Sequence, residues 1–292
     1  MGQKDIREKL LEDYEDVFSD IFNGLLFGED VIKQQYLQSS GTESVYKAEG
    51  GSYRGQFRDV IKEYRNSCML EIGSLGIENQ SVYDKYISVR VMGYDYAKYR
   101  GQIDKKKDPL LPVITIVLSF SDKRWKETKS LHSIMTIPDK FKPYVQDYRV
   151  KVYDIAFLED HIIERFTSDF RLVAKFFKNK RQGRTDLFGE EKINHIEAFM
   201  DFLAVFTDDK RYKQIKKELV IIERERGEVR MCSIAQALEE KGIEKGIEKG
   251  MEKGRILQLV ELVDSGDISL ERAAEKAGMT IENFKEKVKF LE

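Results

Sequence analysis

Apolar residues recur every three or four positions in the first segment of the chain, residues 6–27. This spacing puts apolar side chains on one face of a helix. The pattern therefore predicts an amphipathic helix whose apolar positions are Leu10, Tyr14, Val17, Phe18, Ile21 and Leu25. The polar stretch at residues 38–55, "QSSGTESVYKAEGGSYRG", follows and predicts a loop or an irregular first strand.

Residues 56–80 predict two antiparallel strands. The first, "QFRDVIKEYR" (56–65), and the second, "CMLEIGSLGIENQ" (68–80), are separated by a turn at Asn66-Ser67. The apolar positions of the second strand change parity along its length, from Cys68, Leu70 and Ile72 to Leu75 and Ile77. A β-bulge or bend across Gly73–Gly76 would account for this change.

Later segments predict a crossover helix between neighbouring strands. Residues 84–103 have a near-helical apolar spacing at Tyr86, Val89, Met92, Tyr96 and Tyr99. The run "LLPVITIVLSFS" (110–121) is continuously apolar and β-branched, as in a strand buried on both faces, and residues 148–158 alternate like another strand. The order of these elements predicts an α/β core with parallel pairing, followed by helices from about residue 161.

The C-terminal part of the chain contains a period of four residues. "GIEKGIEKGMEKGR" (242–255) predicts a helix whose glycines each cost about 1 kcal/mol relative to Ala, so it needs a partner. A homo-oligomer formed through this helical tail is expected. The remaining residues predict two short helices with a stop at Gly278 and an N-cap at Thr280, a helix-turn-helix-like unit better suited to protein contacts than to reading DNA.

Composition narrows the class of protein. The chain has 292 residues, of which 41% are hydrophobic and 35% charged, and a net charge of −2. This charge lacks the basic excess of a protein that coats nucleic acid. Two distant cysteines indicate a reducing cytosol, hence a cytoplasmic location, and with three scattered histidines they do not form a zinc motif. No apolar run reaches the ~20 residues that span a bilayer, so no membrane partner is expected.

Candidate chemistry lies at the end of the second strand, in "LGIENQ" (75–80). Glu78 and Gln80 are two positions apart on a strand and so share one face. Asp59 on the paired strand, Glu78 and the backbone carbonyl of Asn79 form an oxygen set suited to Mg²⁺ or Mn²⁺. A regular ladder counted from the turn sets Asp59 opposite residues 74–76, so either the bend or a longer turn has to bring it level with Glu78.

Five segments carry a family resemblance in their order along the chain: "FSDIFNGLLF" (18–27), "RDVIK" (58–62), "LGIENQ" (75–80), "RVMGYDYAKY" (90–99) and "LLPVITIVLSF" (110–120). Their succession resembles the Rpn-type recombination-promoting nucleases, a transposase-related family of the PD-(D/E)xK nuclease superfamily. The resemblance covers roughly residues 15–210, and the glycine-spaced Glu-Lys repeat is also typical of such proteins.

The resemblance implies both a fold and an activity. It implies a restriction-endonuclease-like core, with a mixed sheet flanked by helices, over residues 1–160. A helical region at 161–232 and the repeat with its helical tail at 233–292 would follow. The implied activity is Mg²⁺-dependent DNA hydrolysis linked to recombination, mobile elements or defence in a bacterial cell.

The resemblance also implies roles for individual residues. Asp59 matches the acid of the PD half, preceded by Arg58 rather than Pro, and Glu78 and Gln80 match the (D/E)xK half. Asp59 and Glu78 would bind the metal. Gln80 replaces the usual Lys, as is common in this group, and could orient water but cannot supply charge. Asp20 on the first helix is an additional candidate acid.

Other interpretations stay open for the same residues. Asp59 and Asp20 could be solvated surface groups, and Glu78 and Gln80 could cap the turn or helix that follows. Basic residues that could contact a DNA backbone are Lys175, Lys178, Lys180, Arg181 and Arg184, with Arg90 and Lys98 on the helix after the site. The alternative functions are a catalytically inactive DNA- or protein-binding module, and an interaction scaffold organised by the repeat.

Overall fold

The computed structural model describes residues 11–40, 43–47, 53–57, 59–125, 129–184, 189–207 and 209–289. Contacts between residues divide the chain into two units, Met1–Met231 and Cys232–Glu292. The sequence-based boundary at residue 160 inside the first unit stays a prediction.

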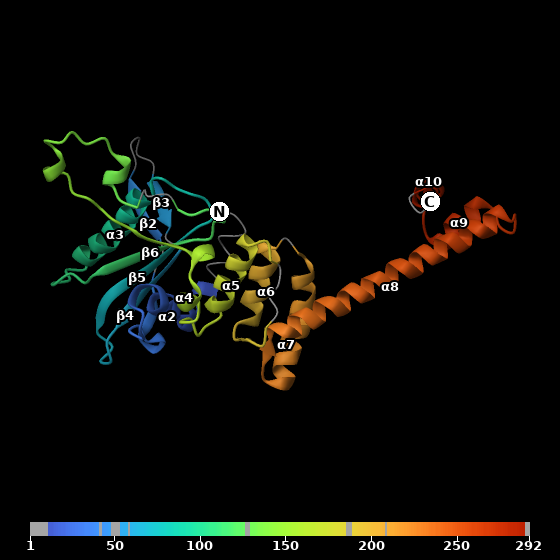
Figure 1. Cartoon of the computed structure of the whole chain (residues 1–292), viewed down its shortest axis with the longest axis horizontal. Coiled ribbons are helices and arrows are strands. Elements are labelled where there is room, and N and C mark those ends of the chain that lie inside the picture. Colours follow the sequence, from blue (N-terminus) through green and yellow to red (C-terminus); the bar gives the residue numbers. More distant parts are fainter. Residues whose placement is uncertain are drawn as a thin grey trace. The chain divides into compact units, whose positions relative to one another are not determined.

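A five-stranded mixed sheet forms the centre of the first unit (Figure 1). Its strand order is β1 (Leu37–Ser39), β4 (Val60–Arg65), β5 (Glu71–Gln80), β6 (Val113–Ser119) and β7 (Lys151–Asp154). The first three strands pair antiparallel, whereas β5, β6 and β7 pair in parallel. Helix α3 (Ile87–Asp104) connects β5 to β6, which confirms the predicted crossover and the α/β class.

Helices α2 (Glu15–Phe22) and α3 cover opposite faces of this sheet (Figure 1). Successive side chains of a strand point to opposite faces. On β4, Lys62 bonds to Glu15 of α2, whereas Glu63 bonds to Lys98 of α3. Because both faces are covered, β5 is buried continuously from Gly73 to Asn79.

The hairpin between β4 and β5 differs from its prediction in two ways. Its turn spans residues 66–70, longer than the Asn66-Ser67 turn predicted, and it leaves Leu70 65% exposed. The ladder is regular where a bend was expected: Tyr64 lies opposite Gly73 and Val60 opposite Ile77. The irregularity is one step earlier, where Arg65 lies opposite Glu71 and Ile72 is the extra residue. The apolar positions change parity for two reasons. Cys68 and Leu70 belong to the turn, and from Gly73 to Asn79 both faces of β5 are buried. A bend at Gly73–Gly76 is therefore not present.

Helix α3 presents a different face to the sheet from the one its apolar spacing predicts. Tyr86, Val89, Met92 and Tyr96 are exposed. The buried face contains Ile87 and Val91 together with polar Asp95 and Gln102. These polar groups are satisfied: Asp95 accepts a bond of 2.6 Å from the Thr115 hydroxyl, and Gln102 bonds to the backbone of Leu111.

The segment predicted as a loop or irregular strand contains a second, two-stranded antiparallel sheet. Strand β2 (Glu43–Lys47) pairs with β3 (Tyr53–Phe57). The preceding residues form the π-helical turn η1 (Asn23–Phe27) and the 3₁₀ turn η2 (Gln34–Tyr36).

The helices predicted from residue 161 onward are confirmed. They are α4 (Asp160–Ile163), α5 (Phe170–Arg181), α6 (Ile196–Phe206) and α7 (Arg211–Arg226). Phenylalanine rings of α5 and α6 pack against one another, with Phe177 and Phe206 centred 5.1 Å apart. The remaining elements are the turns η3 (His132–Ile134), η4 (Lys142–Tyr144) and η5 (Ile155–Phe157) and the short pair β8 (Lys192–Ile193) and β9 (Val229–Arg230).

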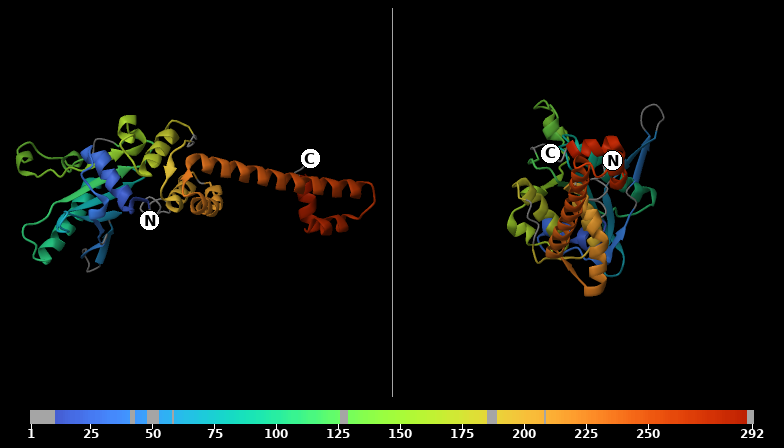
Figure 2. Two further views of the ribbon diagram at one scale, coloured as in Figure 1. Left: turned by 90° about the horizontal axis from the view of Figure 1, so that it is seen from below. Right: turned by 90° about the vertical axis from the view of Figure 1, so that its right-hand side faces the viewer.

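The second unit is helical. Helix α8 (Met231–Asp264) contains the whole repeat, and α9 (Leu270–Ala277) and α10 (Ile281–Lys289) fold back on its end (Figure 2). Ile256, Ala273 and Phe284 are the centre of a small apolar core. The predicted stop at Gly278 is confirmed by its φ of 72°, and the predicted cap by the 3.2 Å bond from the Asn283 amide to the Thr280 hydroxyl. Within the described residues, no helix is long and apolar enough to span a membrane.

Candidate functional site

Glu78 lies near the end of β5 on the face covered by α3. Its side chain is 1% exposed. The Oε1 atom forms an ion pair with the Arg90 guanidinium and accepts a 3.1 Å hydrogen bond from Gln80 Nε2. The Tyr94 hydroxyl lies 3.5 Å from the same oxygen. A carboxylate this deeply buried requires cationic or hydrogen-bonding partners, and α3 supplies them.

Arg90 connects Glu78 to the surface. Its Nη1 atom lies 3.0 Å from Asp84 Oδ2 and 3.4 Å from Gln80 Oε1, while Nη2 pairs with Glu78. Burial disfavours the charged guanidinium, but Glu78, Tyr94 and Asp84 outweigh this effect and raise the pKa of Arg90. Arg90 is therefore a permanent cation within the site.

Asp59 lies at the bend before β4 rather than within a strand. Its Oδ2 atom accepts a 2.6 Å bond from the backbone amide of Asn79. The register of Val60 opposite Ile77, continued by one residue, brings Asp59 level with Glu78. The two acids thus adjoin, and the longer turn is what moves Asp59 past residues 74–76.

Tyr94 responds to both acids. Burial raises the pKa of its phenol, the Glu78 carboxylate raises it further, Arg90 opposes the rise, and the Asp59 carboxylate adds to it. Asp59 and Glu78 therefore act on the same phenol of α3.

Asn79 points its side chain to the other face of the sheet. Its Nδ2 atom donates a 2.6 Å bond to Glu12, which precedes α2. This contact and the bond from its amide to Asp59 fix the backbone between Glu78 and Gln80. The role of the Asn79 carbonyl as a metal ligand stays a prediction.

The donor set suits a hard divalent cation. Asp59 and Glu78 offer carboxylate oxygens at adjoining positions, the ligand type that Mg²⁺ and Mn²⁺ prefer. Within the part of the chain that the structure describes, no three His, Cys, Asp or Glu residues gather as a metal site. A metal here would depend on these two acids, with water, backbone or substrate oxygens completing its coordination.

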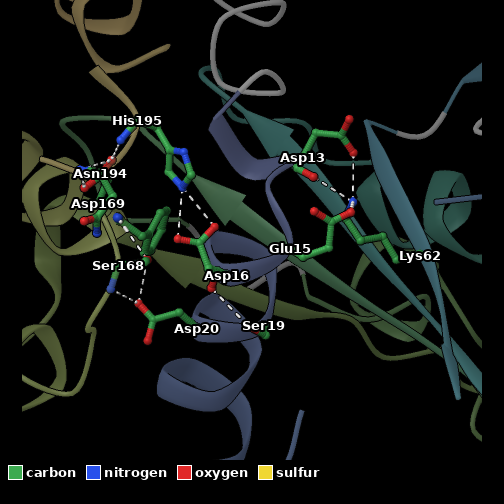
Figure 3. A network of polar contacts seen from close by, with 11 residues as sticks. Asp13, Glu15, Asp16, Ser19, Asp20, Lys62, Ser168, Asp169, Asn194 and His195 are labelled. Atoms are coloured by element: carbon green, nitrogen blue, oxygen red, sulfur yellow. Dashed lines mark hydrogen bonds and ion pairs between the residues drawn. The ribbon is translucent and has the colours of Figure 1, made fainter. Parts of the chain in front are cut away.

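Asp20 does not join this cluster. It lies on α2, on the opposite face of the sheet, and its carboxylate binds the start of α5 (Figure 3). The Ser168 hydroxyl donates a hydrogen bond to Asp20 Oδ2 at 2.6 Å. The backbone amides of Thr167 and Ser168 donate to the same oxygen at 3.0 and 2.9 Å. These bonds give Asp20 a structural role that links α2 to the helical region.

The predicted basic residues of α5 are mostly engaged within the protein. Lys175 pairs with Glu191 and Lys178 with Asp160, at 2.6 and 2.7 Å. Lys180 and Arg181 donate to the carbonyls of Phe206 and Ala156. Arg184 is exposed. A DNA backbone contact by this group stays a prediction.

The sequence alone does not predict that Asp84 and Tyr94 belong to the cluster. Arg90 and Tyr94 are one helical turn apart, a spacing that puts both on one face of a helix. This spacing of polar residues could have indicated a polar face toward Glu78. The apolar stripe of α3 is more prominent in the sequence, but it lies on the opposite side of the helix.

A second polar cluster, also not predicted, joins α2 to the residues before α6 (Figure 3). His195 Nε2 lies 2.9 Å from both carboxylate oxygens of Asp16, and the His195 ring stacks on Tyr14. Burial alone would lower the pKa of His195, but Asp16 raises it. Asp16 and Asp20 are among the residues that line a cleft of about 610 Å³.

Comparison with known proteins identifies one family. Residues 75–204 match the family described as "Putative transposase, YhgA-like". The match contains Glu78, Gln80, Arg90 and all of the sheet from β6 onward, whereas Asp59 precedes it. No curated protein and no solved structure matches the chain. Residues 75–204, which contain β6, β7 and the end of β5, are therefore similar to the YhgA-like putative transposases.

Proposed function

We propose that the protein is a metal-dependent DNA endonuclease. The observation that supports this most directly is the adjacency of Asp59, just before β4, and Glu78, near the end of β5, with Gln80 bonded to Glu78. The similarity of residues 75–204 to a putative transposase family supports the same reaction class, and the link to recombination, mobile elements or defence is part of the proposal.

Each residue has a distinct role in this proposal. Asp59 and Glu78 would hold Mg²⁺ or Mn²⁺, which would lower the pKa of a bound water and neutralise charge on the scissile phosphate. Gln80 orients the attacking water through its amide, because it cannot titrate or carry charge. The bond from the Asn79 amide keeps the Asp59 carboxylate against β5. DNA is the partner, and Arg184 is an exposed cation for its backbone.

Supercoiled plasmid provides the test. The wild type should nick it with Mg²⁺ or Mn²⁺ and not with a chelator. Glu78→Gln and Asp59→Asn should each reduce nicking at least ~100-fold, because each removes a charged metal ligand while nearly preserving shape.

Glu71→Gln is the matched control. Glu71 is on the same strand but pairs with Lys107, away from the candidate site. Equal activity of the Glu78→Gln variant and the wild type would contradict the proposal, provided that thermal unfolding shows both to be folded.

A non-catalytic DNA- or protein-binding module is the second candidate. The specific observation in its favour is the Arg90–Glu78 ion pair, which already neutralises the principal carboxylate. This candidate predicts that the folded protein binds DNA with equal affinity in chelator and in Mn²⁺, and never nicks it.

A further inference from the structure

We propose that Arg90 exchanges partners during the reaction cycle. In the metal-free protein it is the counter-ion of Glu78, and once a divalent cation binds Glu78, Arg90 turns to a phosphate oxygen of the DNA. This inference rests on the proposed function and adds a phosphate-binding residue and a metal-dependent step to it.

The first argument is the competition for Glu78. The Glu78 side chain is 1% exposed, whereas that of Arg90 is 40% exposed. The Glu78 carboxylate therefore lies inside the fold, and the Arg90 guanidinium lies between it and the solvent. A metal ion on Glu78 would lie beside the guanidinium charge at the same carboxylate, and two neighbouring cations repel strongly in a partly buried site.

The second argument is the anchor on the surface side. Nη1 of Arg90 lies 3.0 Å from Asp84, and Nη2 pairs with Glu78. Asp84 is itself fixed, because its Oδ1 accepts a 2.8 Å bond from the Tyr86 amide before α3. If the bond to Glu78 breaks, the bond to Asp84 keeps the guanidinium in place, and the Nη2 hydrogen that faced Glu78 becomes available beside the 3.4 Å contact of Nη2 with the Tyr94 hydroxyl.

The third argument concerns charge. Gln80 is bonded to Glu78, but an amide supplies no positive charge. Arg90 lies 3.4 Å from the Gln80 oxygen and brings a cation to the same place from α3. A planar guanidinium also matches a phosphate with two parallel donors.

Metal binding without DNA tests the competition. Calorimetric titration of the full chain with Mn²⁺ should show roughly ten-fold tighter binding for Arg90→Met than for the wild type, because a competing cation is gone. Lys98→Met is the matched control, since Lys98 is also on α3 but pairs with Glu63. Its Mn²⁺ affinity should equal that of the wild type.

Arg90→Gln is a second variant, for use if Arg90→Met does not fold. Arg90→Met leaves a buried carboxylate without this counter-ion and could destabilise the fold. Glutamine keeps a hydrogen-bond donor for Glu78 but no charge, so it should also tighten Mn²⁺ binding. Thermal unfolding identifies which variants are folded.

DNA binding tests the second partner. The affinity for a short duplex is measured against salt, once in chelator and once in Ca²⁺ as a non-catalytic oxygen-binding cation. The plot of the logarithm of the binding constant against the logarithm of the salt concentration has a negative slope. Loss of one phosphate contact makes this slope shallower by about 0.9. Arg90→Gln should show this loss in Ca²⁺ and show none in chelator, where Arg90 of the wild type still binds Glu78.

The outcomes separate the two proposals. Unchanged or weaker Mn²⁺ binding in both Arg90 variants, with normal binding by the wild type, overturns the partner exchange and leaves the nuclease proposal standing. Tighter Mn²⁺ binding without the Ca²⁺-dependent slope change overturns the phosphate contact. If neither the wild type nor any folded variant binds Mn²⁺, the nuclease proposal fails and the exchange fails with it.

Discussion

The imidazole of His195 is held by the carboxylate of Asp16, with Nε2 at 2.9 Å from each oxygen. The two residues are far apart in sequence, and their contact links α2 to the residues that precede α6. Both side chains retain some exposure, at 18% and 34%, so solvent screens the pair.

The pair predicts a pH-dependent stability. Asp16 raises the pKa of His195, so the pair stabilises fully below the unfolded pKa of histidine and loses this contribution as pH rises through the higher folded value. Burial would raise the pKa of Asp16, but His195 lowers it, so the contribution is also lost in acid as Asp16 protonates. We expect His195→Gln to lower the free energy of unfolding by about 1 kcal/mol near pH 5.5 and by less near pH 9. Urea unfolding at both pH values measures this, and an equal loss at both would exclude a charged pair.

Two substitutions of Lys62 should change the free energy of unfolding by different amounts. Its side chain is fully buried, and its Nζ atom bonds to Asp13 and Glu15, which are 63% and 50% exposed (Figure 3). Since these acids can rehydrate, Lys62→Met should change the free energy of unfolding by less than about 1 kcal/mol. Lys62→Ala leaves a cavity against Phe18 and should cost about 2–4 kcal/mol. Similar losses for both variants in denaturant unfolding would instead show that the charge itself is required.

Two glycines predict stability changes of opposite sign. A Cβ at Gly24 would lie 2.4 Å from the ring of Phe166, which is fully buried. Gly24→Ala should therefore cost about 1–3 kcal/mol through overpacking. Gly101 of α3 has no atom within 4 Å of such a Cβ, so Gly101→Ala should stabilise the helix by up to about 1 kcal/mol. The melting temperatures of the two variants should move in opposite directions, and a parallel shift would contradict the packing at Gly24.

The repeat helix predicts an effect on assembly. A Cβ added at Gly242, Gly246, Gly250 or Gly254 would meet no atom of another element within 4 Å, and Ile243, Ile247 and Met251 are more than half exposed. We propose that a second copy of the chain packs along this side, where glycine allows close approach of two backbones. Replacing all four glycines by alanine should then lower the mass in solution while it stabilises the helix itself. Light scattering that gives the monomer mass for the wild type would refute this assembly.

Much of the first unit could be predicted because its signals are local. The continuous apolar run at β6 and the crossover at α3 are patterns within a short window, and they define the parallel part of the sheet. Glu78 and Gln80 also lie two positions apart, so their shared face follows from strand geometry alone.

The parts that sequence did not predict depend on tertiary contacts. The length of the turn after Arg65 cannot be counted from residue types, yet it determines that Asp59 meets Glu78. The buried face of α3 carries Asp95 and Gln102, whose cost of burial is offset by bonds that include those to Thr115, Tyr148 and Leu111. Asp16 and His195 pair across the fold, and no local pattern indicates that contact.

The four-residue period of α8 has a geometric consequence for whatever lies along it. An α-helix turns by about 100° and rises about 1.5 Å per residue, so each Gly-Ile-Glu-Lys unit advances about 6 Å and overshoots a full turn by about 40°. The line from Ile243 through Ile247 to Met251 therefore slants around the helix axis instead of running parallel to it. A straight neighbouring helix could follow that line for only a few units. Adding or deleting one unit would rotate α9 and α10 about the axis of α8, relative to the first turns of that helix, as well as move them along it.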